Sequence, residues 1–100
     1  MSYYVYILFS KGANKYYIGQ SKNVEERLIL HNNSDYQSYT SKFAPWEIKL
    51  IMDLGENRGI AMRIEKYLKR QKSRKFIERL IESEELQNSI LNRFQSDNKN

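Results

Sequence analysis

Two short runs of β-branched and aromatic residues lie close together at the start of the chain. Residues 3–9 read Tyr-Tyr-Val-Tyr-Ile-Leu-Phe, and residues 15–19 read Lys-Tyr-Tyr-Ile-Gly. These residue types favour strands, and a run as short and apolar as the first is typical of a strand buried on both faces. The connection at residues 10–14 contains Gly and Asn, which favour tight turns. The sequence therefore predicts an antiparallel β-hairpin.

Helical spacing replaces the strand pattern after the hairpin. Asn23 followed by Glu26 has the spacing of a helix N-cap and a third-position carboxylate, so we expect a short helix over residues 24–31. The next segment, residues 32–44, is polar and ends before Pro45, the only proline of the chain. Because such segments seldom form regular structure, we expect an exposed loop within reach of a substrate.

The second half of the chain predicts one more strand and three more helices. Apolar residues alternate with polar or smaller neighbours along residues 46–54, which is the period of a strand. After a break at residues 55–59, apolar residues recur at helical spacing to about Lys72, and Ser73 is placed to cap a third helix. A fourth helix is expected in the tail, and residues 95–100 are expected to fray. This order describes an α+β domain in which helices flank a small antiparallel sheet.

The composition is that of one soluble globular domain. With 100 residues, 40% hydrophobic and 29% charged, the chain is long enough for one modest core and too apolar for a disordered protein. The absence of cysteine excludes disulfides and thiolate-bound metal centres. No segment resembles a spanning helix or a signal peptide, so we expect no membrane partner and a cytoplasmic location. A net charge of +5 favours a polyanionic partner, although many basic proteins do not bind nucleic acid.

Tyrosines occupy similar places in the two strands of the predicted hairpin. Residues 4–6 read Tyr-Val-Tyr and residues 17–19 read Tyr-Ile-Gly. Strand pairing would bring them together, either as cross-strand aromatic pairs that stabilise the sheet or as part of a site. Gly19 would let the backbone bend or approach a ligand closely, and a plain turn glycine explains it equally well.

Arg27 and His31 are four residues apart, so a helix would place both side chains on one face. A guanidinium binds phosphate through its planar fork of donors, and an imidazole orients water or exchanges a proton near neutral pH. Taken alone, the pair also fits a solvated helix face with an incidental histidine.

Glu65 lies among basic residues of the predicted second helix. It either forms surface ion pairs with its neighbours or faces the sheet and holds a divalent cation, since hard cations prefer carboxylate oxygen. The basic run at residues 69–75, which includes Lys69 and Lys72, is either solvated surface or a face that contacts backbone phosphates.

Taken together, these residues resemble the GIY-YIG nuclease superfamily, in particular its small stand-alone members that are similar to the N-terminal domain of the excinuclease incision subunit. The resemblance covers about residues 2–81. Its most specific stretches are residues 3–8 (Tyr-Tyr-Val-Tyr-Ile-Leu), 16–21 (Tyr-Tyr-Ile-Gly-Gln-Ser), 23–28 (Asn-Val-Glu-Glu-Arg-Leu) and 31–32 (His-Asn), followed by 39–40, 45–46 and 61–69. The first motif reads Tyr-Val-Tyr where the family name has Gly-Ile-Tyr, which keeps the tyrosine.

The resemblance implies a fold and a site. The family's fold, a three-stranded antiparallel sheet flanked by helices, agrees with the order predicted from periodicity. The implied catalytic residues are Tyr6, Tyr17, Arg27 and His31, and the implied metal ligand is Glu65, which would hold Mg²⁺ or Mn²⁺. The implied substrate-binding residues are Gly19, Ser21, Asn32, Lys69 and Lys72. Which tyrosine acts as the general base stays open.

The implied activity is metal-dependent hydrolysis of DNA phosphodiester bonds, as in DNA repair or recombination, without an organic cofactor. Residues 1–82 would form the nuclease domain and residues 83–100 a helical C-terminal tail. A second interpretation is a nucleic-acid-binding module, or a subunit without turnover that depends on a protein partner for target specificity. A third, a structural domain whose tyrosines only pack, does not predict Arg27, His31 and Glu65 together.

Overall fold

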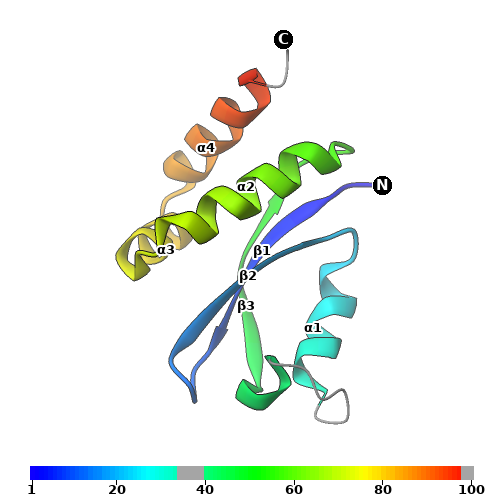
Figure 1. The fold of residues 1–100 in the computed structure, drawn as a ribbon, viewed down its shortest axis with the longest axis vertical. Helices are drawn as coiled ribbons and strands as arrows, with labels where there is room; N and C mark the ends of the chain where they lie inside the picture. Colours follow the sequence, from blue (N-terminus) through cyan, green and yellow to red (C-terminus); the bar gives the residue numbers. More distant parts are fainter. Residues whose placement is uncertain (34–39, 98–100) are drawn as a thin grey trace.

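The computed structural model describes residues 1–33 and 40–97, and that part of the chain contains one three-stranded antiparallel sheet. Its strands are β1 (Tyr4–Ser10), β2 (Lys15–Ser21) and β3 (Trp46–Asp53), in the spatial order β2-β1-β3 (Figure 1). β1 and β2 form the predicted hairpin, and β2 continues past its predicted end because Ser21 pairs with Tyr4. As the central strand, β1 is covered on both faces, which confirms the interpretation of its apolar sequence.

The described helices are α1 (Val24–Asn32), the short 3-10 helix η2 (Thr40–Phe43), α2 (Arg58–Gln71), α3 (Arg74–Glu82) and α4 (Glu84–Asp97). The predicted caps are confirmed, since the side chains of Asn23 and Ser73 accept the backbone N–H groups of Glu26 and Phe76. Asn57 caps α2 in the same way. Among the described residues, no helix has the length and apolar character needed to cross a membrane.

The predicted exposed loop over residues 32–44 is wrong at its C-terminal end. Residues 40–43 form η2, and Thr40 is buried. A single 3-10 turn is too short to carry an apolar period, so its sequence cannot be told from that of a loop. Residues 34–39 of the predicted loop lie outside the described residues.

Alternation of side chains along β1 builds two cores, one on each face of the sheet. Val5 and Ile7 face the larger core, which buried residues of α2, α3 and α4 complete. The smaller core consists of Tyr6, Leu8, Val24 and Trp46. Figure 1 shows α1 on one side of the sheet and α2 on the other. The smaller core therefore lies between the sheet and α1, and it contains the hydroxyl of a tyrosine.

The C-terminal helix packs on the larger core. Ile90 of α4 is 4% exposed and belongs to this core. Partly buried apolar residues of the same helix, Leu86, Leu91 and Phe94, pack against it. These contacts reach the last turns of α4, which continues to Asp97, so the predicted fraying of residues 95–97 is wrong. Residues 98–100 lie outside the described residues.

Candidate active site

The strand register places two tyrosines of the hairpin on the same face of the sheet. Tyr6 in β1 lies opposite Gly19, and Leu8 lies opposite Tyr17. Residues that lie opposite each other in an antiparallel pair share a face, and so do residues two apart on one strand. Tyr6 and Tyr17 are therefore diagonal neighbours, with ring centroids 6.4 Å apart. Both pack with the smaller core, on the face that α1 covers.

His31 comes from the last turn of α1 and contacts both tyrosines. Its Nε2 lies 3.1 Å from the Tyr6 hydroxyl, and its ring centroid lies 4.6 Å from that of Tyr17. Tyr6 is fully buried and His31 is nearly so, whereas Tyr17 is partly exposed. The structure thus brings together three predicted site residues from three different elements.

Arg27 lies one helical turn before His31 and completes this group. Its side chain is exposed, and its guanidinium is close enough to the Tyr6 hydroxyl to lower the pKa of that group. The arginine thus connects the buried tyrosine with the surface of the molecule. His31 contacts Tyr6 and Arg27 lowers the pKa of Tyr6, in agreement with the predicted common face of the two residues on α1.

Burial keeps the two polar groups at the centre of the site uncharged. It raises the pKa of the Tyr6 hydroxyl above the ordinary 10.0, while the guanidinium of Arg27 lowers it and the negative charge of a tyrosinate at position 17 would raise it further. Burial also lowers the pKa of His31 below 6.5, and the positive charge of Arg27 adds to this decrease. Desolvation disfavours the charged form of each group, so a phenol faces a neutral imidazole near neutral pH.

Gly19 is required by the close approach of the Tyr6 ring. A Cβ atom at this position would lie 2.5 Å from the Tyr6 hydroxyl oxygen and 2.6 Å from its Cζ. Packed interiors do not accommodate contacts this short, so a side chain here would push Tyr6 away from His31. The predicted contact of Gly19 with substrate stays a prediction, and the structure adds a separate reason for a glycine.

Glu65 lies on α2 and is 22% exposed. Its Oε2 lies 3.3 Å from Nζ of Lys69, which is the surface ion pair that the sequence left open. Its negative charge also raises the pKa of the Tyr6 hydroxyl, so the carboxylate is close enough to act on the tyrosine. Glu65 is therefore an electrostatic neighbour of the site as well as a partner of Lys69.

A metal ion at Glu65 would have one carboxylate ligand from this region. Within residues 1–33 and 40–97, no three His, Cys, Asp or Glu side chains gather into a group that could hold a metal. Mg²⁺ binds oxygen ligands and keeps several of its waters, so one carboxylate and a substrate phosphate satisfy its chemistry. The donor present therefore fits a hard divalent cation.

Two predicted substrate-binding residues have partners within the fold. Ser21 Oγ accepts the backbone N–H of Asn23 at 2.9 Å, at the start of α1. Asn32 Oδ1 accepts the backbone N–H of Trp46 at 2.5 Å, and its Nδ2 donates to the Trp46 carbonyl at 3.2 Å. These bonds tie the two ends of α1 to the sheet, and contact of Ser21 and Asn32 with substrate stays a prediction.

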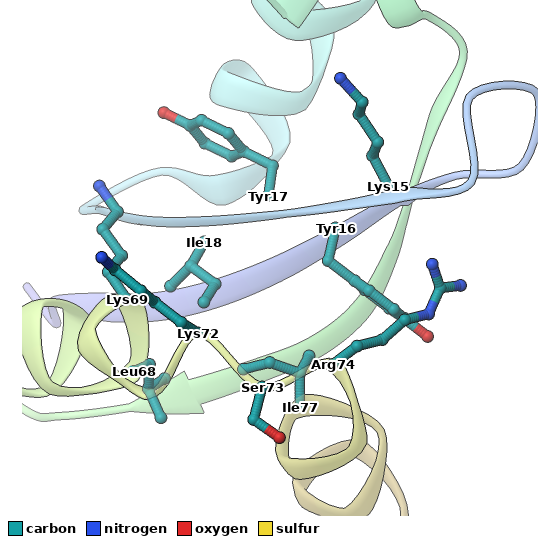
Figure 2. A pocket seen from close by; sticks show the side chains of 10 residues that line it. All are labelled: Lys15, Tyr16, Tyr17, Ile18, Leu68, Lys69, Lys72, Ser73, Arg74 and Ile77. Carbon is teal, nitrogen blue, oxygen red and sulfur yellow. The ribbon is translucent and has the colours of Figure 1, made fainter.

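A groove runs along the edge strand β2 and includes Tyr17 in its lining (Figure 2). Its charged lining residues are all basic: Lys15, Lys69, Lys72 and Arg74. Figure 2 shows the amino groups of Lys69 and Lys72 at the same end of the groove as the Tyr17 ring. Lys69 and Lys72, which the sequence analysis gives as substrate-binding residues, therefore border the site. Arg74 belongs to the predicted basic run at residues 69–75. Lys15 was not predicted, because nothing in the local sequence shows that the hairpin lies beside the start of α3.

Thr40 and Trp46 complete the site, and sequence analysis assigned neither of them a role. Thr40 Oγ1 lies 2.8 Å from His31 Nδ1. Trp46 Nε1 donates to the Thr40 carbonyl at 2.7 Å, and the Trp46 and Tyr17 rings meet edge to face with centroids 6.1 Å apart. The available signal was the family-like sequence at residues 39–40 and 45–46, which marked these positions without indicating what they contact.

Comparison with known proteins gives one family. The family model described as the GIY-YIG catalytic domain matches residues 2–78. The matched segment contains all five residues that the sequence predicted as catalytic or metal-binding: Tyr6, Tyr17, Arg27, His31 and Glu65. Comparisons with curated proteins and with solved structures give no match.

Proposed function

The chain belongs to the GIY-YIG family of catalytic domains, and from this premise we propose that it is a metal-dependent endonuclease that hydrolyses DNA phosphodiester bonds. The observation that carries the proposal is the contact of Tyr6, Tyr17 and His31 on one sheet face. Cross-strand packing would explain the two tyrosines alone. It would not explain a buried histidine that reaches the Tyr6 hydroxyl, with an arginine that lowers the pKa of the same hydroxyl.

Tyr6 and His31 form a pair that can take up a proton. Neutral His31 has one ring nitrogen able to accept, and the Tyr6 hydroxyl lies against Nε2. A proton arriving at the Tyr6 oxygen is balanced by transfer of the tyrosine's own proton to Nε2, which leaves a phenol and an imidazolium. Tyr17 is partly exposed and lines the groove, so we assign it the contact with the attacking water.

Arg27 and Glu65 supply the charges that phosphodiester hydrolysis requires. Arg27 is exposed, and its planar fork of donors suits the phosphoryl oxygens that gain negative charge in the transition state. Glu65 would hold Mg²⁺ or Mn²⁺, and such a cation, when bound, supplies positive charge to the phosphoryl and leaving oxygens.

The basic groove extends the site along the DNA backbone. Lys69 and Lys72 border Tyr17, so we propose that they contact phosphates next to the scissile one. Such contacts carry no base readout, and they suit an enzyme that recognises DNA structure rather than sequence. We therefore include branched and damaged DNA, the substrates of repair and recombination, among the substrates to be tested.

A cleavage assay tests the proposal. Plasmid, branched duplex and damaged duplex DNA are incubated with Mg²⁺ or Mn²⁺ and either the unaltered chain or the Glu65→Gln, Tyr17→Phe or Tyr6→Phe variant. We expect the unaltered chain to cut, and each variant to cut on the order of 10²–10⁴-fold more slowly, the range for loss of one proton-transfer or charge-stabilising group. Arg58→Gln, a change at an exposed residue at the far end of α2, is the control and should cut normally.

The outcomes separate the interpretations. No cutting with either metal on any substrate would remove the enzyme proposal, and DNA binding without cutting would favour the binding-module or partner-dependent interpretation. Cutting that survives Glu65→Gln would remove the metal assignment while the nuclease proposal stands. Preference for branched or damaged DNA would support a role in repair or recombination.

A further inference from the structure

The imidazole of His31 is held at both ring nitrogens by buried hydroxyl groups. Nε2 lies 3.1 Å from the Tyr6 hydroxyl, and Nδ1 lies 2.8 Å from Thr40 Oγ1. His31 is 7% exposed and Thr40 is 6% exposed, so solvent has little access to either bond. A neutral imidazole carries one proton, so one of its nitrogens donates and the other accepts. The positions of the two hydroxyls therefore bear on which tautomer the site contains.

The burial of Tyr6 sets the direction of the Tyr6–His31 bond. The Tyr6 side chain is fully buried, so its O–H needs an acceptor within the protein. Nε2 of His31 lies within hydrogen-bond distance of the hydroxyl and supplies that acceptor. With Nε2 accepting, the single imidazole proton lies on Nδ1 and is donated to Thr40 Oγ1.

We propose that Thr40 is a positioning residue that fixes His31 in the tautomer with its proton on Nδ1 and its lone pair on Nε2, facing Tyr6. The inference rests on the proposed function, because it gives the Tyr6–His31 pair its direction. Only this tautomer has an acceptor where the Tyr6 proton would arrive, since the opposite tautomer would place an N–H against the hydroxyl.

The fold holds Thr40 at this place through β3. The Thr40 carbonyl accepts the indole N–H of Trp46, and the Trp46 backbone is bonded at both its N–H and carbonyl groups to Asn32, the neighbour of His31 on α1. The histidine, the threonine and the start of β3 thus form a closed ring of contacts. A partner fixed in this way orients the imidazole, as carboxylates and carbonyls do in other histidine sites.

Long-range ¹H–¹⁵N NMR of the imidazole tests the proposal directly. His31 is the only histidine of the chain, so every imidazole signal belongs to it. In the unaltered protein near neutral pH, we expect Nδ1 to show the shift of a protonated nitrogen and Nε2 that of an unprotonated one. Thr40→Val keeps the size of the side chain and removes the acceptor, which leaves a buried Nδ1–H without a partner, so the fraction of the Nε2-protonated form should rise. Thr40→Ser restores Oγ and should restore the original spectrum.

Two controls separate positioning from folding. Ser41→Ala removes the neighbouring hydroxyl and should leave the tautomer unchanged. The indole N–H signal of Trp46, the only tryptophan, reports the bond to the Thr40 carbonyl, which valine retains. If Thr40→Val fails to fold, the spectra of the unaltered protein and of Thr40→Ser still show which ring nitrogen of His31 carries the proton. Nε2 protonated in the unaltered protein, or a folded Thr40→Val variant with an unchanged spectrum, overturns the inference.

The spectra need no DNA, so the two proposals fail separately. The expected tautomer in a chain that cuts no substrate would remove the proposed function. Cutting by a chain whose His31 carries its proton on Nε2 would remove only the role of Thr40.

Discussion

At the scale of single residues, Tyr6 shows how a polar group becomes part of a core. Its ring lies among Leu8, Val24 and Trp46. Burial of its hydroxyl without a hydrogen-bond partner would lower the stability of the fold by about 1–3 kcal/mol. His31 supplies that partner. Among the described residues, no buried side-chain nitrogen or oxygen lacks a hydrogen bond. The contact on which the proposed proton transfer depends therefore also satisfies a buried hydroxyl.

The lowered pKa of His31 predicts a dependence of stability on pH. Burial lowers the folded-state pKa below 6.5, so the unfolded chain binds more protons as the pH falls through 6.5. The free energy of unfolding should therefore be constant above that pH and decrease on acidification until the folded-state pKa is passed. Urea unfolding between about pH 8 and about pH 5, followed by Trp46 fluorescence, measures this change.

The chain's composition makes this prediction specific. His31 is the only histidine of the chain, so no other side chain has an ordinary pKa near that of histidine. His31→Gln removes the titrating group and should remove the decrease over the upper part of the range, before the carboxylates titrate. An unaltered chain whose stability stays flat or rises on acidification would contradict a buried, neutral His31.

At the scale of elements, the caps and apolar periods in the sequence determine where helices begin, and tertiary packing determines what the helices contact. The side chains of Asn23 and Ser73 cap α1 and α3 as predicted. α4 has apolar residues at helical spacing, but its sequence does not show whether they pack on the domain or remain available to another molecule. In the structure they join the larger core through Ile90. The division into residues 1–82 and residues 83–100 stays a prediction.

Ile90→Ala tests that packing. Ile90 is 4% exposed, so its truncation leaves a cavity in the larger core and should lower the free energy of unfolding by about 2–5 kcal/mol. Ile29→Ala is the matched control, since Ile29 is 66% exposed on α1 and its loss should change stability by only about 0.5 kcal/mol. Chemical denaturation of both variants measures the difference. Equal effects would show that α4 does not contribute to the core.

At the scale of the whole molecule, the fold gathers positive charge beside the candidate active site. The net charge of +5 is spread along the sequence, but the groove at β2 collects basic residues from the hairpin, α2 and α3. Because phosphates bound by such residues release counterions, the affinity for DNA should depend on salt. Composition alone indicated a polyanionic partner, and the groove indicates where that partner would bind.

Lys72→Gln tests the groove. Loss of one phosphate contact should reduce the slope of log affinity against log salt by about 0.9. Binding of a short labelled duplex is measured by fluorescence anisotropy over a range of salt, with Glu65→Gln present in every protein to prevent cleavage. Arg58→Gln removes the same charge at the other end of α2, outside the groove lining, and should leave the slope nearly unchanged. A slope that changes equally in both variants would show that only net charge matters.

Much of the fold follows from local sequence. The hairpin, the third strand and the helix caps depend on neighbouring residues, through the period of two in strands and the cap preferences of helices. The family resemblance added the roles of Tyr6, Tyr17, Arg27, His31 and Glu65. The structure adds contacts of Tyr6 and Tyr17 with each other and with His31. Their roles in catalysis stay proposals.

The sequence by itself thus determined the order of elements, the tyrosine-bearing hairpin and the helix face shared by Arg27 and His31. Only the tertiary structure decided that Gly19 makes room for the Tyr6 ring, that Thr40 holds His31, and that charges from three elements line one groove. The physical reason is distance along the chain. A cap or a strand period involves near neighbours, whereas a buried hydroxyl, its histidine and the ring that excludes a side chain meet only after the strands pair and α1 packs on the sheet.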